Sequence, residues 1–254
     1  MNPAMGRGRL AEAGDYLLLW RFCLANLGVL RLAPYQRRCL QLFLDGAEKT
    51  AAGSGLRAAA VGALAVAAAL DALSAHADLA VRMVLLSVVR ELAPLLAALI
   101  VLIRVGSPVT GDIALMPARG EERALRLLGL SSRAYIAVPP LVAVTSLALV
   151  FTFYFELLVL GGGIGLGALL FGLPLSGMLS QVALLVTPGD LLYTVAKSLG
   201  FGLVIGSVSV HQGLRPGLDA ARLPDALAAS VMQCLSLLLA LNAVLAWFAY
   251  GLAS

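Results

Sequence analysis

Long apolar segments, separated by short polar stretches, make up the hydrophobic pattern of this chain. Each segment is near the roughly 20 residues that a helix needs to cross a hydrocarbon core of about 30 Å. The pattern therefore predicts an all-α polytopic membrane bundle with about five transmembrane helices. The predicted spans cover residues 56–77, 81–103, 134–160, 191–210 and 226–253.

The N-terminal segment has a different pattern, in which arginine and other polar residues interrupt the apolar runs. Residues 16–32 and 35–44 are predicted to be amphipathic helices lying in the cytoplasmic membrane interface. A sixth span over 16–32 is the alternative. We therefore divide the chain into a cytoplasmic N-terminus with interfacial helices, residues 1–50, and a transmembrane domain, residues 51–254.

An uncharged stretch rich in glycine and proline separates the third and fourth predicted spans. It begins with Gly161, Gly162 and Gly163 and is followed by Asp190. Glycine and proline at this density break helices. We therefore expect the third span to end here, a bent or re-entrant hairpin to follow, and Asp190 to cap the fourth span.

Composition supports a membrane protein and argues against several other classes. The chain is 61% hydrophobic and 13% charged, whereas soluble domains carry roughly 25% charged residues. Its three cysteines are widely spaced, so they indicate neither a disulfide framework nor a zinc site. The sequence also lacks the glycine-rich, lysine-containing loop that binds nucleotide phosphates. We therefore predict no metal, no cofactor and no enzymatic activity in this chain.

The distribution of basic residues predicts how the bundle is oriented. Of the 18 lysines and arginines, 15 fall in residues 1–57, 104–133 and 211–225. Basic segments stay on the cytoplasmic side of a membrane. The N-terminus and both basic loops are therefore predicted to be cytoplasmic, and five spans then place the C-terminus in the periplasm. Anionic lipid, and not nucleic acid, is the expected neighbour of this basic face.

Two adjacent charges, Arg90 and Glu91, interrupt the second predicted span, and Pro94 follows them. A charge at bilayer depth costs on the order of 3 kcal/mol and survives where it is paired or faces a watery cavity. Together with the bend expected at proline, this pattern indicates a transport pathway. Alternatively, the two charges form a pair at the membrane surface, and only residues 92–103 are buried.

Lys197 is the corresponding charge of the fourth predicted span. Two interpretations remain open for it: pairing with Glu91 or a lipid phosphate inside the membrane, or snorkelling to the nearer interface. Glu156 lies near the outer end of the third predicted span, and we assign it to the membrane boundary.

The basic loop 104–133 contains a short amphipathic segment with the pattern of a docking helix. Glu122 and Arg126 stand four residues apart in the favourable order, and Gly129 is suited to end the helix. Such a helix between two spans offers a contact for a soluble partner. The residues assigned to that contact are Glu121, Glu122, Arg123, Leu125, Arg126 and Leu128.

Taken together, these motifs resemble the MlaE/YrbE family of permease subunits from bacterial lipid ABC transporters that work with MCE proteins. The most specific part is residues 86–100, which read Leu-Ser-Val-Val-Arg-Glu-Leu-Ala-Pro-Leu-Leu-Ala-Ala-Leu-Ile. The other similar blocks are residues 104–107, 112–116, 127–130, 187–202 and 211–215.

The resemblance implies a permease in the bacterial inner membrane that moves phospholipid to or from a periplasmic MCE carrier. It also implies a separate ABC ATPase and a second permease subunit, in a homodimer or a heterodimer. The chain departs from the family at Arg119-Gly-Glu-Glu122, where relatives carry Thr-Glu-Gln, and at Asn242, where an acidic residue is common. The alternative function is therefore a non-transporting scaffold or the degenerate half of a heterodimeric permease.

Overall fold

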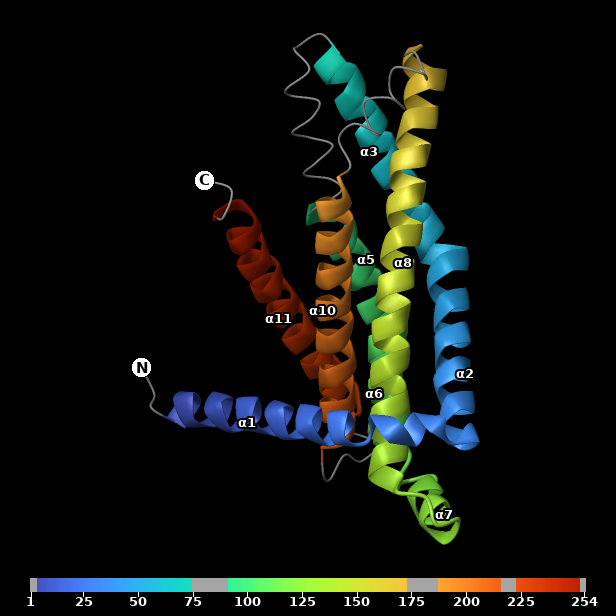
Figure 1. Ribbon diagram of the computed structural model, residues 1–254, viewed down its shortest axis with the longest axis vertical. Coiled ribbons are helices and arrows are strands. Elements are labelled where there is room, and N and C mark those ends of the chain that lie inside the picture. Colours follow the sequence, from blue (N-terminus) through green and yellow to red (C-terminus); the bar gives the residue numbers. More distant parts are fainter. Residues whose placement is uncertain (1–3, 75–90, 173–186, 216–222, 252–254) are drawn as a thin grey trace.

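The computed structural model describes residues 4–74, 91–172, 187–215 and 223–251, and every regular element in these ranges is a helix. Most helices run back and forth along one long axis (Figure 1). In chain order the helices are α1 (Ala4–Ala25), η1 (Leu27–Arg31), α2 (Ala33–Lys49), η2 (Thr50–Gly55), α3 (Leu56–Ser74), α5 (Ala93–Val101), η4 (Leu102–Gly106), α6 (Ser107–Leu115), α7 (Glu121–Leu127), α8 (Ser132–Phe171), α10 (Pro188–Gly213) and α11 (Leu223–Gly251).

Four of the described helical segments are long and apolar enough to cross a membrane. This finding confirms the predicted all-α membrane bundle, to which α3 adds the shorter apolar segment Leu56–Ala68. The four candidate spans are Ala93–Leu115, Ser132–Leu170, Pro188–Gly213 and Leu223–Ala249.

The two N-terminal helices take different directions (Figure 1). Helix α1 lies across one end of the bundle, as an interfacial helix would. Helix α2 instead stands along α8 and continues through the π-helical turn η2 into α3. The orientation of α2 thus differs from the flat helix expected over 35–44. Its buried residues explain the difference, because the Tyr35 ring meets Tyr135 edge-on at 5.4 Å and Gly46 admits Leu147.

The second membrane helix extends further than the predicted span. Residues 81–90 lie outside the described residues, but α5, η4 and α6 follow one another without a break as far as Leu115. The expectation of a loop from residue 104 is therefore wrong for its first part. Val105, Val109 and Ile113 recur every four residues and are all buried, so the apolar face continues past the predicted end.

Helix α8 continues through the glycine-rich stretch that was expected to end it. It reaches Phe171 and stops at Gly172, which has a left-handed φ of 65°. A Cβ on Gly163 would lie 2.6 Å from a methyl carbon of Val66 on α3. Gly162 and Gly163 therefore allow α8 and α3 to pack closely, and this contact offsets their low helix propensity of about 1 kcal/mol each. The predicted hairpin falls on residues 173–186, outside the described residues.

Helix α10 begins with a capping box. Thr187 is the N-cap, and its hydroxyl accepts from the Asp190 amide while the Asp190 carboxylate accepts from the Thr187 amide. The predicted helix start is close, but Asp190 occupies the third helical position and is not the N-cap itself. The box satisfies backbone donors that would otherwise lack partners at the helix start.

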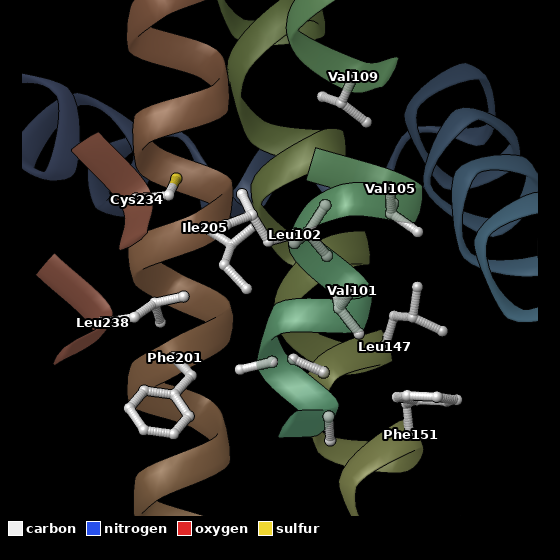
Figure 2. Packing of buried hydrophobic residues seen from close by; sticks show 14 of the residues in the cluster. Val101, Leu102, Val105, Val109, Leu147, Phe151, Phe201, Ile205, Cys234 and Leu238 are labelled. Carbon is white, nitrogen blue, oxygen red and sulfur yellow. The ribbon is translucent and has the colours of Figure 1, made fainter. Parts of the chain in front are cut away.

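Helix α10 forms the centre of the bundle and packs against α5, α6, α8 and α11. Figure 2 shows its Phe201 and Ile205 among side chains of α5, η4 and α11. Its Gly202 and Gly206 face the backbone of α8: a Cβ on Gly202 would lie 2.7 Å from the Thr145 Cα. This pair of glycines four residues apart therefore brings the two helix axes close together.

Candidate functional site

An ion pair inside the bundle joins the start of the second membrane helix to α10. The Lys197 ammonium donates to Oε2 of Glu91 at 2.6 Å, and Lys197 is fully buried. The Tyr193 hydroxyl donates to the other oxygen of Glu91 at 3.1 Å. Tyr193 and Lys197 are four residues apart, so one face of α10 holds the carboxylate through two donors.

This geometry decides between the interpretations left open for Lys197. Its side chain turns into the bundle and pairs with Glu91, so the snorkelling alternative is wrong for the described structure. The Lys197 ammonium also lies 5.3 Å from the centre of the Tyr193 ring and 5.9 Å from that of Phe201. Arg90 lies outside the described residues, and its role stays a prediction.

Glu156 of α8 is a further member of this cluster. It was assigned to the membrane boundary, but only 7% of its surface is exposed and its carboxylate faces α10. The Thr194 hydroxyl hydrogen-bonds this carboxylate, and Lys197 attracts it electrostatically. Among the residues that the structure describes, its Oε1 atom has no hydrogen-bond partner. Helix α8 continues for four more turns beyond Glu156, so this carboxylate lies within a helix interface and not at a helix end.

An apolar pocket adjoins the charged cluster. It has a volume of about 150 Å³ and lies between α3, α8 and the start of the second membrane helix. Leu92 and Ala93 in its wall directly follow Glu91, and Phe155 directly precedes Glu156. An apolar pocket beside buried charges suits a molecule with a hydrocarbon chain and a charged head. The lining residues are Gly62, Ala65, Val66, Leu92, Ala93, Leu96, Phe155 and Val159.

The short helix α7 lies beyond the N-terminal start of α8, at the same end of the bundle as α1 (Figure 1). Gly129 ends it with φ 72°, and the amide of Leu130 donates to the carbonyl of Leu125. These two features form the Schellman arrangement that closes many helices. The predicted Glu122–Arg126 pair is present, so the local structure of this segment could be predicted from its sequence.

The outward surface of α7 combines apolar and basic side chains. Leu127 and Leu128 are 83% and 73% exposed, whereas Leu125 is half-buried. Arg123 and Arg126 are also exposed. The sequence-based prediction assigns Leu125 and Leu128 to the partner contact and omits Leu127. In the described structure, Leu127 is the most accessible apolar side chain of this helix.

Sequence comparisons with known proteins place this chain among membrane permeases. The sequence model of the family described as "Permease MlaE" matches residues 50–248. The chain is 26% identical to a probable ABC transporter permease protein of Porphyra purpurea over 167 residues. This aligned region covers 66% of this chain and 64% of that protein. A probable ABC transporter permease protein of Synechocystis is 26% identical over 165 residues, which is 65% of this chain and 63% of that protein.

A third relative, from Rickettsia prowazekii, carries the same description of probable ABC transporter permease protein. It is 27% identical over 159 residues, which is 63% of this chain and 61% of that protein. The chain thus spans less than two thirds of the length of these curated relatives.

Proposed function

The chain belongs to the MlaE permease family, since the family's sequence model covers residues 50–248, and on this premise we propose that it is the permease subunit of an ABC transporter for phospholipid. Its proposed partners are a separate ABC ATPase, a second permease subunit and a periplasmic MCE-domain carrier. The proposed location is the bacterial inner membrane. ATP hydrolysis takes place in the partner chain, and this chain performs no covalent chemistry.

The observation that carries the proposal is the buried Glu91–Lys197 pair beside an apolar pocket. A phospholipid has a phosphate that accepts hydrogen bonds and acyl chains that need an apolar surface. The phosphate takes the place of the Glu91 carboxylate on Lys197 and Tyr193, which are both donors. Part of one acyl chain lies in the pocket between α3 and α8.

Displacement of the Glu91 carboxylate by the lipid phosphate also links lipid binding to a change of conformation. Glu91 precedes α5, whereas Lys197 and Tyr193 belong to α10, so the pair holds these two helices together. A lipid that binds Lys197 releases Glu91 and weakens this connection. The ligand therefore has a different free energy of binding in the closed and opened arrangements, as a ligand-driven change requires.

The proposed orientation places α7 in the cytoplasm. Helices α1 and α7 lie at the same end of the bundle, which is also the end where α10 finishes (Figure 1). Residues 116–131 of the first basic loop connect α6 through α7 to α8 at this end, and α10 ends there at Gly213. The concentration of basic residues at this end supports a cytoplasmic location by the positive-inside rule. The C-terminus is then periplasmic.

In this proposal α7 couples the permease to the ATPase. Its departure from the family pattern at residues 119–122 favoured a non-transporting scaffold. However, those residues retain an ordered helix start, where Gly120 has φ 70° and Arg119 pairs with Glu121 at 3.6 Å. A helix with a defined start and end, and with exposed leucines and arginines, supports coupling to an ATPase more than it supports a degenerate, non-transporting subunit.

The experiment that tests the proposed function is purification of the tagged chain from its native membrane in mild detergent. Mass spectrometry then identifies the retained proteins and lipids. We expect an ABC ATPase and bound phospholipid, and less phospholipid with Lys197→Met. Lys49→Met removes an exposed lysine and serves as the matched control. Equal phospholipid in all three preparations, or no retained ATPase, would refute the proposal.

A further inference from the structure

Glu156 has an unmet capacity for hydrogen bonds inside the bundle. The residue is 93% buried, given its 7% exposure, and Thr194 donates to its carboxylate. Its Oε1 atom, however, has no partner among the described residues. An unpartnered buried oxygen of a carboxylate is costly. Such an atom therefore indicates a group that donates to it in another state of the protein.

The balance of charges indicates the sign of that group. The described cluster holds two carboxylates, Glu91 and Glu156, and one cation, Lys197. Lys197 is bonded to Glu91 at 2.6 Å and also attracts Glu156 electrostatically. A ligand that brings a further cation with N–H groups therefore complements this cluster better than a ligand with negative charge alone.

We propose that Glu156 recognises the primary ammonium group of a zwitterionic phospholipid headgroup, of the ethanolamine type. This inference rests on the proposed function. The phosphate of the lipid accepts from Lys197 and Tyr193, and its ammonium donates to Oε1 of Glu156. A quaternary ammonium has no N–H to donate, and a glycerol headgroup has no cation. Glu156 is thus a specificity-determining residue of the lipid site.

The headgroup gains access to Glu156 when the lipid phosphate displaces Glu91 from Lys197. In the described structure Oε1 lies inside the helix interface and has no contact with solvent. The headgroup reaches it when the Glu91–Lys197 pair opens and α5 moves away from α10. The apolar pocket, whose wall includes Phe155 next to Glu156, receives the part of an acyl chain that lies close to the headgroup.

The test measures headgroup preference directly. The purified protein is incubated with an equimolar mixture of phosphatidylethanolamine, phosphatidylcholine and phosphatidylglycerol, and the retained lipids are quantified by mass spectrometry. For the wild type we expect about a tenfold enrichment of phosphatidylethanolamine, which corresponds to ~1.4 kcal/mol. Glu156→Gln should abolish the enrichment. Glu48→Gln, which removes an exposed carboxylate, should preserve it.

Each remaining outcome decides the question. Retained lipid with the same headgroup ratios in the wild type and Glu156→Gln overturns this inference and leaves the proposed function standing. The same holds if Glu156→Gln lowers thermal stability but keeps the enrichment, because Glu156 is then only a counter-ion of Lys197. If Glu156→Gln does not fold, Glu156→Asp retains the charge, withdraws it by one methylene group and should lower the enrichment. Failure of the wild type to retain more lipid than Lys197→Met refutes the proposed function itself.

Discussion

Replacing Lys197 with methionine is the sharpest perturbation of the charged cluster. Methionine keeps most of the side-chain volume, so the packing beside Phe201 is preserved while the only described cation of the cluster is lost. Glu91 and Glu156 then remain as two carboxylates in the helix interface without their shared counter-ion. Glu91→Gln is the milder change, because Lys197 keeps its attraction to Glu156.

The magnitudes follow from burial. Removing one partner of a buried ion pair costs about 3–5 kcal/mol, because the other charge is left uncompensated. Lys197 is fully buried, and the Glu91 side chain is only 19% exposed. We therefore expect Lys197→Met to lower the free energy of unfolding by about 3–5 kcal/mol. For Glu91→Gln we expect about 1–3 kcal/mol, the cost of a weakened hydrogen-bonded contact.

The assay is reversible unfolding of the detergent-solubilised protein in increasing denaturant, with Lys49→Met as the control for loss of an exposed lysine. The double variant Glu91→Gln/Lys197→Met should cost less than the two single changes together, because both remove the same interaction. A Lys197→Met protein within about 0.5 kcal/mol of wild type, the range of ordinary surface substitutions, would refute the assignment of a buried, structural ion pair.

Three further predictions test topology, coupling and packing. In a cysteine-free background, Gly120→Cys should be labelled only from the cytoplasm and Ser254→Cys only from the periplasm, and cytoplasmic labelling at 254 would contradict the five-span topology. Leu127→Asp places a charge on an 83% exposed side chain, so the permease should stay folded but lose its ATPase on co-purification; normal ATPase stoichiometry would exclude this face from coupling. Gly202→Ala should destabilise the protein by about 1–3 kcal/mol, since the new Cβ would lie 2.7 Å from the backbone of α8. Gly165→Ala has open space inside α8 and should stabilise the protein by about 0.5–1 kcal/mol in the same unfolding assay.

The membrane helices could be predicted because they follow from local properties of the chain, and the Glu91–Lys197 contact was one of the alternatives that the sequence left open. An apolar run of sufficient length predicts a span, and two opposite charges within spans seek one another at bilayer depth. The Thr187–Asp190 capping box also had a sequence signal, since a threonine followed three residues later by an acidic side chain marks a helix start.

The continuation of α8 past Glu156 could not be predicted, because it depends on whether the following glycines end the helix. Gly161, Gly162 and Gly163 favour a break when considered alone. Only the presence of Val66 and its neighbours on α3 turns this run into a packing surface that keeps α8 helical. The direction of α2 likewise depends on tertiary contacts, because its amphipathic pattern suits packing on α8 as well as lying in an interface.

The most direct test of the proposed transport function is lipid transfer by the reconstituted complex. The chain is placed in proteoliposomes with the ATPase and the MCE carrier that co-purify with it, and labelled phospholipid is followed between membrane and carrier. We predict transfer that requires ATP hydrolysis and that falls when Glu91→Gln weakens the connection between the second membrane helix and α10 while the ATPase stays bound. Transfer that proceeds equally without ATP, or no transfer by an intact complex that hydrolyses ATP, would contradict the assignment as a phospholipid permease.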